Sequence, residues 1–396
     1  MLYLKYMRSL VIVSSLILLQ LYTTVFGDTS KTAAHFLKIV NDPGAVAMGN
    51  CAVNNIDAQS ALYNPGAMGL FHFEKNFSIS LPNNTMYLKE LTDNLRLKTI
   101  SISGGITLKQ LNKSFHHKFN ASLSFAYSRQ KISYGEIEIT NTQGEELGTN
   151  KPFEKASNYS IGLGLEYYAR IGIGMSIKKV NSSLSFNLNP NSIERISAKT
   201  TGYDLGVIFE LPLGEIIPIE LPLGARNINF DLIPSYAYVQ ANSGNDLIIL
   251  QDRFPDINFK LPKISRKGYS VFGSINLDES SLFSYRLVSE TEEDLVNEDV
   301  EDIEKNGSEI GFLGIFYYRW GKYEDRLGPI DIKTSGYAIN LKNIIKWFDT
   351  VGPGYNSKTA RYISDHFDFI FEYASYDDEE YEVLSNTSFI KINFSI

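Results

Sequence analysis

The residues that could do chemistry in this sequence are few, and the most suggestive set is Asp365-His366-Phe367-Asp368. On an extended strand, His366 and Asp368 share one face, while Asp365 points to the other. An acid–histidine pair for hydrolysis is therefore one interpretation, and a polar cluster where a loop enters a strand is the other. The sequence holds no Gly-x-Ser-x-Gly elbow, no His-Glu-x-x-His, no phosphate-binding loop and no cysteine pair for zinc. We therefore predict no enzymatic activity, no cofactor and no metal site.

Two other polar segments favour loops over binding sites. His116-His117 stands between two predicted strands and is typical of a polar connection. Residues 290–304 contain nine carboxylates, which could bind calcium or a basic partner. Their spacing lacks the pattern of a defined calcium loop, and blocks of like charge are usually solvated, mobile loops. We predict a solvated loop outside the cell.

A repeated Glu-Leu-Pro-Leu-Gly at 210–214 and 220–224 is the third unusual segment. Proline cannot continue a central strand, so these residues predict an irregular connection. Leu211, Pro212, Leu221 and Pro222 are candidates for a partner-docking or interfacial site, and duplication by chance is the alternative.

The N-terminus indicates where the chain works. Lys5 and Arg8 precede an apolar run at 10–21, and Val25-Phe26-Gly27 provides small residues at a cleavage site before Asp28. This predicts a signal peptide at 1–27; an N-terminal membrane anchor is the alternative. Without its two basic residues, the chain has 35 basic against 45 acidic residues, which gives no basic face for nucleic acid. A single cysteine excludes an intrachain disulfide.

The positioning elements are strands, because apolar residues alternate with Gly, Ser and charged residues along most of the chain. Residues 159–167 and 171–178 are clear examples, joined by a short connection at 168–170. Thirteen strands are predicted, at 72–81, 98–110, 118–130, 157–168, 170–186, 199–210, 227–240, 267–277, 281–289, 308–320, 331–341, 366–376 and 388–396. Bacterial barrels have an even number of strands, so we expect a fourteenth, and 132–140 is either that strand or the outer half of its predecessor.

Strand length favours a membrane barrel over the alternative, a soluble β-sandwich. Many predicted strands reach ten residues, which is long for soluble sheets and near the length that crosses a bilayer at a tilt. Short turns of such barrels face the periplasm, so the connection at 168–170 should be periplasmic.

Residues 28–70 differ from the rest because they are small and polar without sustained alternation. A compact piece of this kind ahead of a barrel is expected to pack inside it, since a fourteen-stranded barrel is too wide for its own side chains to fill. We predict that Phe36, Leu37, Tyr63, Asn64 and Pro65 are buried in the lumen, with Asn64 hydrogen-bonded to the inner wall. A flexible periplasmic tether is the alternative.

The same segment resembles the N-terminal signature of the PorV/PorQ family, within the long-chain fatty-acid transporter-like outer-membrane barrels. The stretches that carry the resemblance are Phe36-Leu37-Lys38-Ile39, Pro43-Gly44-Ala45-Val46-Ala47-Met48-Gly49, Asp57-Ala58-Gln59-Ser60-Ala61-Leu62-Tyr63-Asn64-Pro65-Gly66 and, later, Arg319-Trp320-Gly321-Lys322-Tyr323. The resemblance implies an all-β fold, a single transmembrane antiparallel β-barrel of fourteen strands whose lumen is plugged by the N-terminal segment. The expected divisions are 1–27, 28–70 and 71–396.

The resemblance implies an outer-membrane protein that contacts lipid, and it leaves three functions open. One is protein export or surface assembly of the type IX secretion kind, with secretion-machinery proteins or exported cargo as partners. The second is transport of a hydrophobic small molecule such as a long-chain fatty acid, with the plug as gate. The third is a structural or adhesive barrel without cargo.

Overall fold

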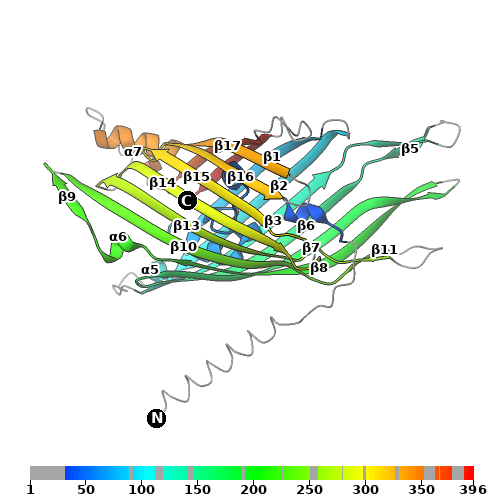
Figure 1. Cartoon of the computed structure of the whole chain (residues 1–396), viewed down its shortest axis with the longest axis horizontal. Helices are drawn as coiled ribbons and strands as arrows, with labels where there is room; N and C mark the ends of the chain where they lie inside the picture. The colour runs from blue at the N-terminus through cyan, green and yellow to red at the C-terminus, as the bar shows by residue number, and fades with distance from the viewer. Residues whose placement is uncertain are drawn as a thin grey trace, which may run out of the picture.

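Fourteen antiparallel strands in the described part of the chain close into one barrel (Figure 1). The computed structural model describes residues 32–88, 92–111, 119–140, 146–189, 192–224, 226–249, 257–278, 280–297, 300–325, 330–351, 362–364, 366–376 and 388–396. The predicted signal peptide, His116-His117 and Asp365 lie outside these residues. The barrel strands are β1 (Phe77–Leu88), β2 (Thr92–Thr107), β3 (Asn120–Ser133), β6 (Phe153–Glu166), β7 (Arg170–Asn189), β8 (Ser192–Glu210), β10 (Arg226–Gly244), β13 (Ile264–Leu277), β14 (Ser280–Asp294), β15 (Ile303–Phe312), β16 (Phe316–Asp325), β17 (Ile330–Asn340), β18 (Asp368–Tyr376) and β19 (Ser388–Ser395).

The barrel closes because the first strand pairs with the last. β1 is hydrogen-bonded to β2 on one side and to β19 on the other, with Ser78 opposite Ser395. β10 likewise joins β8 to β13. Full closure leaves no unpaired barrel edge, as a β structure surrounded by lipid requires. The predicted fold class is confirmed.

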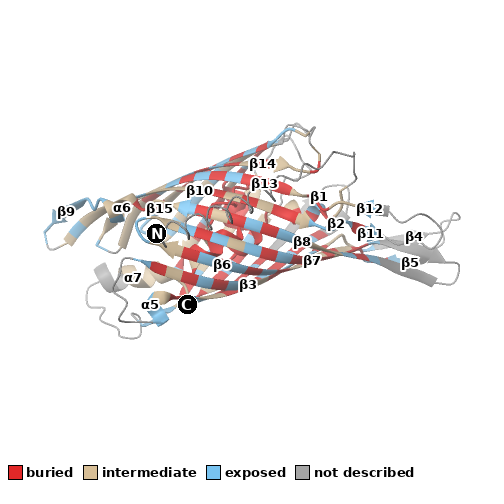
Figure 2. Cartoon of the chain, turned by 90° about the horizontal axis from the view of Figure 1, so that it is seen from below, coloured by how far each residue is buried: buried red, intermediate tan, exposed pale blue. Residues whose placement is uncertain are grey.

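Alternation along the strands separates an apolar outer face from a polar inner one, and the banding in Figure 2 shows the matching alternation of buried and exposed residues. Ile161, Leu163 and Met175 are exposed, whereas Ser160 and Ser176 on the same strands are buried and hydrogen-bonded to each other at 2.8 Å. In a soluble sandwich the apolar side would face a core. Here it faces outward, which excludes that alternative.

The two ends of the barrel differ. One end, the turn end, carries the connections at 167–169 and 313–315 and the short elements α5 (Leu108–Leu111), α6 (Leu213–Ile216), β9 (Glu220–Leu223) and α7 (Leu341–Val351). The other, the extension end, carries the hairpins of β4 (Ile137–Thr140) with β5 (Glu146–Asn150) and of β11 (Leu247–Ile249) with β12 (Ile257–Phe259). Among the described residues, no helix is both long and apolar enough to cross a membrane.

The fourteenth strand does not lie where the sequence placed it. The segment predicted as one strand at 308–320 is two strands, β15 and β16, which pair through Phe312 and Phe316. The chain reverses at Leu313 and Gly314, both with positive φ (57° and 63°). Leucine rarely adopts this conformation, so the turn had no clear sequence signal. Residues 137–140 instead form β4, which pairs only with β5.

The acidic run is also different from the predicted solvated loop. Glu290 and Glu292 belong to β14 and are buried on the inner face, with exposed fractions of 1% and 4%. Lys305 lies 2.8 Å from both carboxylates. The charge density misled the prediction because alternation, and not charge, decides which side chains enter the lumen.

Residues 32–76, the inner segment, run through the barrel from end to end. Thr32 bridges to Lys260 at the extension end, and Asn76 donates its backbone N–H to Ile396 at the turn end. The segment contains a 3-10 helix, η1 (His35–Lys38), and three short helices, α2 (Pro43–Ala47), α3 (Ser60–Tyr63) and α4 (Pro65–Phe71). Helices this short are not stable alone in water, so the surrounding wall must hold them.

Candidate functional site

The inner segment and the wall it touches form the candidate site, beginning with α4. Asn64 is the N-cap of this helix: its Oδ1 accepts from Gly66 N–H at 3.0 Å, and Pro65 occupies the first turn. The same amide donates through Nδ2 to the carbonyl oxygens of Val53 (3.0 Å) and Val207 (3.1 Å). One side chain thus joins the helix start, a neighbouring loop and strand β8.

Glycines on both surfaces let α4 touch the wall directly. A Cβ placed on Gly174 would lie 2.3 Å from the carbonyl oxygen of Pro65, and one on Gly172 would lie 2.2 Å from that of Gly66. The Gly and Ser of the inner face therefore have a packing role here. Because glycine has no side chain, the backbone of α4 can lie directly against the backbone of the strands.

We predict that Gly174→Ala loosens the inner segment without preventing barrel assembly. Overpacking of this kind costs about 1–3 kcal/mol, which should lower the temperature at which the folded form is lost on a heat-shift gel. Gly104→Ala is the matched control, because its Cβ would meet nothing closer than 3.6 Å. Equal stability of the two variants would contradict this contact.

The remaining sequence-predicted residues are buried at two other places. Phe36 and Leu37 lie in an apolar cluster at the extension end with inward-facing residues of the wall: Leu95, Leu97, Ile132, Ala156 and Val180, together with Leu261. Tyr63 accepts a hydrogen bond from Asn41 N–H at 2.8 Å through its hydroxyl. Burial raises the pKa of Tyr63, so this hydroxyl stays neutral.

A buried ion network, which the sequence did not indicate as a site, fixes the middle of the inner segment. Lys391 on β19 contacts Asp42, Glu372 and Asp57, the last at 3.2 Å. Arg319 extends the network, with Nη1 2.6 Å from Glu372. Burial raises the pKa of Asp42 to about 7, although the Lys391 ammonium opposes this shift.

A second network holds the next loop. Glu290 Oε2 accepts from the backbone N–H groups of Ala52 (2.7 Å) and Val53 (2.9 Å), while Lys305 balances its charge. Arg266 pairs with Glu292 at 2.9 Å and donates to the Lys38 carbonyl oxygen at 3.1 Å. Cys51 lies fully buried beside this network. Burial also raises the pKa of its thiol, which keeps it protonated and unreactive.

The lumen around the inner segment is polar at the turn end. Three cavities of about 710, 570 and 310 Å³ adjoin there, and Arg286 lines all three. Arg286 lies over the Phe272 ring at 5.5 Å. Most of the other charged residues along these cavities are paired, as Arg170 is with Glu166 at 3.0 Å. The lumen thus changes from apolar at the extension end to charged at the turn end.

The candidate hydrolytic pair is not assembled. Asp368 pairs with Lys75 at 2.7 Å, whereas the exposed His366 stacks on Tyr362 and contacts its carbonyl oxygen. No group of metal-ligating side chains occurs among the described residues.

The connection at 211–224 projects from the turn end (Figure 1). Pro212 is buried, but Leu221 is half exposed, and Ile217, Ile219 and Leu223 are exposed beside it. β9 pairs only with β10, opposite Arg226–Asn229. We call residues 211–224 the foot.

Comparisons with known proteins give matches among solved barrel structures. No family model matches the chain, and no curated protein does. The toluene transporter TodX of Pseudomonas putida is 10% identical with a TM-score of 0.39, covering 89% of this chain and 95% of its own. A FadL homologue of Pseudomonas aeruginosa is 9% identical (TM-score 0.36; 93% and 98%).

The transport unit of the autotransporter AIDA-I of Escherichia coli is 10% identical (TM-score 0.35; 81% and 88%). At these values the fold assignment rests on the strand topology of this chain. The resemblance to PorV/PorQ stays an expectation from sequence.

Proposed function

We propose that the protein is an outer-membrane barrel that admits a hydrophobic solute, with the inner segment as its plug and gate. The membrane location is supported by the outer face. Large apolar side chains such as Phe125 of β3, Ile173 of β7 and Leu205 of β8 are exposed over the middle of the barrel. A soluble protein rarely exposes so large a contiguous apolar surface, whereas lipid solvates it at no cost.

The location predicts a specific cleavage pattern. A protease site inserted after Gly135, at the extension end, should be cut in intact cells, since the long extensions of such barrels face outward. A site inserted after Asp278, in the tight β13–β14 turn, should be cut only after permeabilisation. The opposite pattern would show that the turn end, and not the extension end, faces outward. A protein that stays soluble without detergent would contradict the membrane location.

The observation that carries the solute proposal is the apolar cluster at the extension end. Inward positions elsewhere on these strands are polar, as Ser101, Ser103, Ser128 and Asn158 are, yet Leu97 and Ile132 face the lumen directly opposite each other. Phe36 of the inner segment occupies this pocket with an exposed fraction of 1%. We propose that a hydrophobic solute takes the place of Phe36 and Leu37, and that their release moves the plug.

Uptake of the fluorescent apolar probe N-phenylnaphthylamine tests this proposal in a host strain without its own hydrophobic-solute channels. Expression of the protein should speed uptake, and L97N/I132N should abolish the gain by making the pocket polar. Ile208→Asn is the matched control, since Ile208 is equally buried but lies with Leu70 of α4, outside this pocket. No gain from the unaltered protein would overturn the proposal.

Protein export or surface assembly is the second candidate, and two observations favour it. The buried networks at Lys391 and Glu290 suit a plug that never moves. The foot offers exposed apolar side chains where a partner could dock. L221D/L223D should then lose a co-purifying envelope protein while probe uptake is unchanged; a solitary protein from detergent-solubilised membranes would count against this function.

A further inference from the structure

Six basic side chains gather on the outer face near the extension end, over β2, β3, β6, β7 and β8. They are Lys98, Arg129, Lys131, Lys155, Lys179 and Lys199, which we call the basic face. Lys155 is partly exposed and the other five are exposed. The alternation of the strands places them outside: both neighbours of the first five in the chain are buried within the barrel, as Leu97 and Thr99 are, and Ala198 beside Lys199 is buried too.

Strand register arranges these cations in two adjacent rows. Lys98 is directly opposite Lys131, and Lys131 is directly opposite Lys155. The same row ends at Lys199, opposite Asn181 of β7. The next row contains Arg129 and Lys179. The row from Lys98 to Lys199, which we call the upper row, spans four gaps between neighbouring strands and is therefore about 19 Å wide.

Like charges directly opposite each other destabilise a sheet, and no carboxylate of the described residues forms an ion pair with these six side chains. Neither row contains an acidic residue. Among the described residues, the lysine of this region that has an ion pair is Lys151, which lies 2.9 Å from Glu136 and outside both rows. Phe153 lies under the ammonium groups of Lys131 and Lys155, at 4.9 and 5.9 Å, which positions them without neutralising them.

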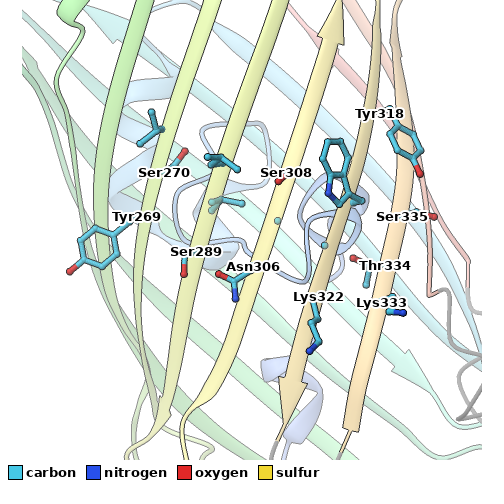
Figure 3. Close-up of a pocket in the computed structure, with 16 residues that line it drawn as sticks. Tyr269, Ser270, Ser289, Asn306, Ser308, Tyr318, Lys322, Lys333, Thr334 and Ser335 are labelled. Carbon is cyan, nitrogen blue, oxygen red and sulfur yellow. The ribbon is translucent and has the colours of Figure 1, made fainter.

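On the opposite wall, other outward lysines have carboxylate partners. Lys322 faces outward from β16 there, directly opposite Lys333 of β17 (Figure 3). Lys322 contacts Glu324 and lies 2.9 Å from Asp331, and Lys267 lies 3.8 Å from Glu293. Carboxylate partners for outward lysines therefore occur on this wall, whereas the two rows of the basic face contain none.

The height of the basic face matches the edge of the apolar belt. The row below it contains Tyr127, Tyr159 and Tyr203, residues that favour a membrane interface. From Ile171 at the turn end to Lys179, eight residues rise about 27 Å along the strand. With a tilt of about 40° this is about 20 Å along the barrel axis, close to the height of an apolar belt.

We propose that the basic face binds the phosphate groups of an anionic, multiply phosphorylated glycolipid in the outer leaflet of the membrane. Cations spread over two rows and about 19 Å can engage two phosphates of one headgroup, which a singly charged phospholipid does not offer. The Tyr row and the belt below it would contact the acyl chains. This inference depends on the membrane location and not on the transported solute.

The test measures binding of bisphosphorylated lipid A to the purified full-length barrel in a neutral detergent. K98Q/K131Q/K155Q should weaken binding about tenfold or more, and salt should weaken it further. K109Q/K151Q/K267Q is the control: it removes the same charge from exposed lysines that already pair with carboxylates, and should change binding less than twofold.

Both variants should still show the heat-dependent gel shift of a closed barrel, because the test variant removes like-charge opposition. Equal binding by the two variants would overturn the proposal. Equal binding of phosphatidylglycerol and lipid A would overturn the glycolipid assignment. An acidic protein that co-purifies with the unaltered barrel and is lost only from the test variant would assign the face to a protein partner instead.

Discussion

Lys391→Met should make Cys51 react with maleimide at least about 100-fold faster in the native barrel, because removal of one partner from a buried ion pair costs about 3–5 kcal/mol. Lys391 is the shared cation of Asp42, Asp57 and Glu372, and its loss leaves the two buried carboxyl groups, those of Asp42 and Glu372, without this partner. Cys51 is the sole cysteine and is fully buried. Its labelling therefore reports opening of the inner segment.

The effect of Lys391→Met should grow with pH. Burial already raises the pKa of Asp42 to about 7, and loss of the opposing ammonium raises it further. A carboxyl whose folded pKa is raised stabilises the folded state least when it is ionised, so stability falls as pH rises from 5 to 8. The pH dependence of this opening is measured by the labelling rate of Cys51 in the native protein, divided at each pH by the rate in the denatured protein.

Lys322→Met is the control for the labelling experiment. Lys322 also contacts two carboxylates, but it is 43% exposed, so solvent replaces it at little cost. Labelling of Cys51 should be unchanged. A Lys391→Met barrel that labels as slowly as the unaltered protein would show that the network does not hold the segment.

Deletion of residues 34–71 should convert a closed barrel into an open pore. The inner segment runs through the lumen from one end to the other, and the wall that its deletion would expose is lined mostly by Gly, Ser and charged residues, which admit water. In planar bilayers the deletion variant should conduct in discrete steps, while the full-length protein stays closed.

The heat-dependent gel shift serves as control for the deletion, since barrel closure depends on strand pairing, which the deletion leaves intact. A deletion variant that assembles yet does not conduct would mean that the wall collapses or that another segment closes the pore. A full-length protein that conducts as well as the deletion variant would show that the inner segment does not plug the barrel.

The sequence was sufficient for the barrel wall because alternation is a local property. Residues 159–167 and 171–178 already indicated β6 and β7, and the face of each side chain followed from parity. The sequence did not indicate the turn between β15 and β16, because Leu313 there has a positive φ, which leucine rarely adopts. Glu290 and Glu292 were misplaced because a charge run was given more weight than the alternation beneath it.

The anchors of the inner segment could not be predicted in the same way. Lys391 lies within the last predicted strand, at 388–396, but Asp42 stands 349 positions away. Nothing local connects the two residues. The small residues of 28–70 indicated a compact inner piece, yet the contact of Gly174 with Pro65 is a product of the closed barrel.

The course of the inner segment has a topological consequence. The chain is threaded through its own barrel, entering the wall at the turn end through β1, which pairs with β19. Lys391, on that last strand, forms an ion pair with Asp42 of the inner segment. The seam between the first and last strands therefore closes a barrel whose lumen holds the segment of chain that leads into β1. A folded domain fused ahead of residue 28 would have to pass with the inner segment through the lumen to the extension end. We expect such a fusion to accumulate as a precursor in which β1 and β19 are not paired, and which therefore shows no heat-dependent gel shift.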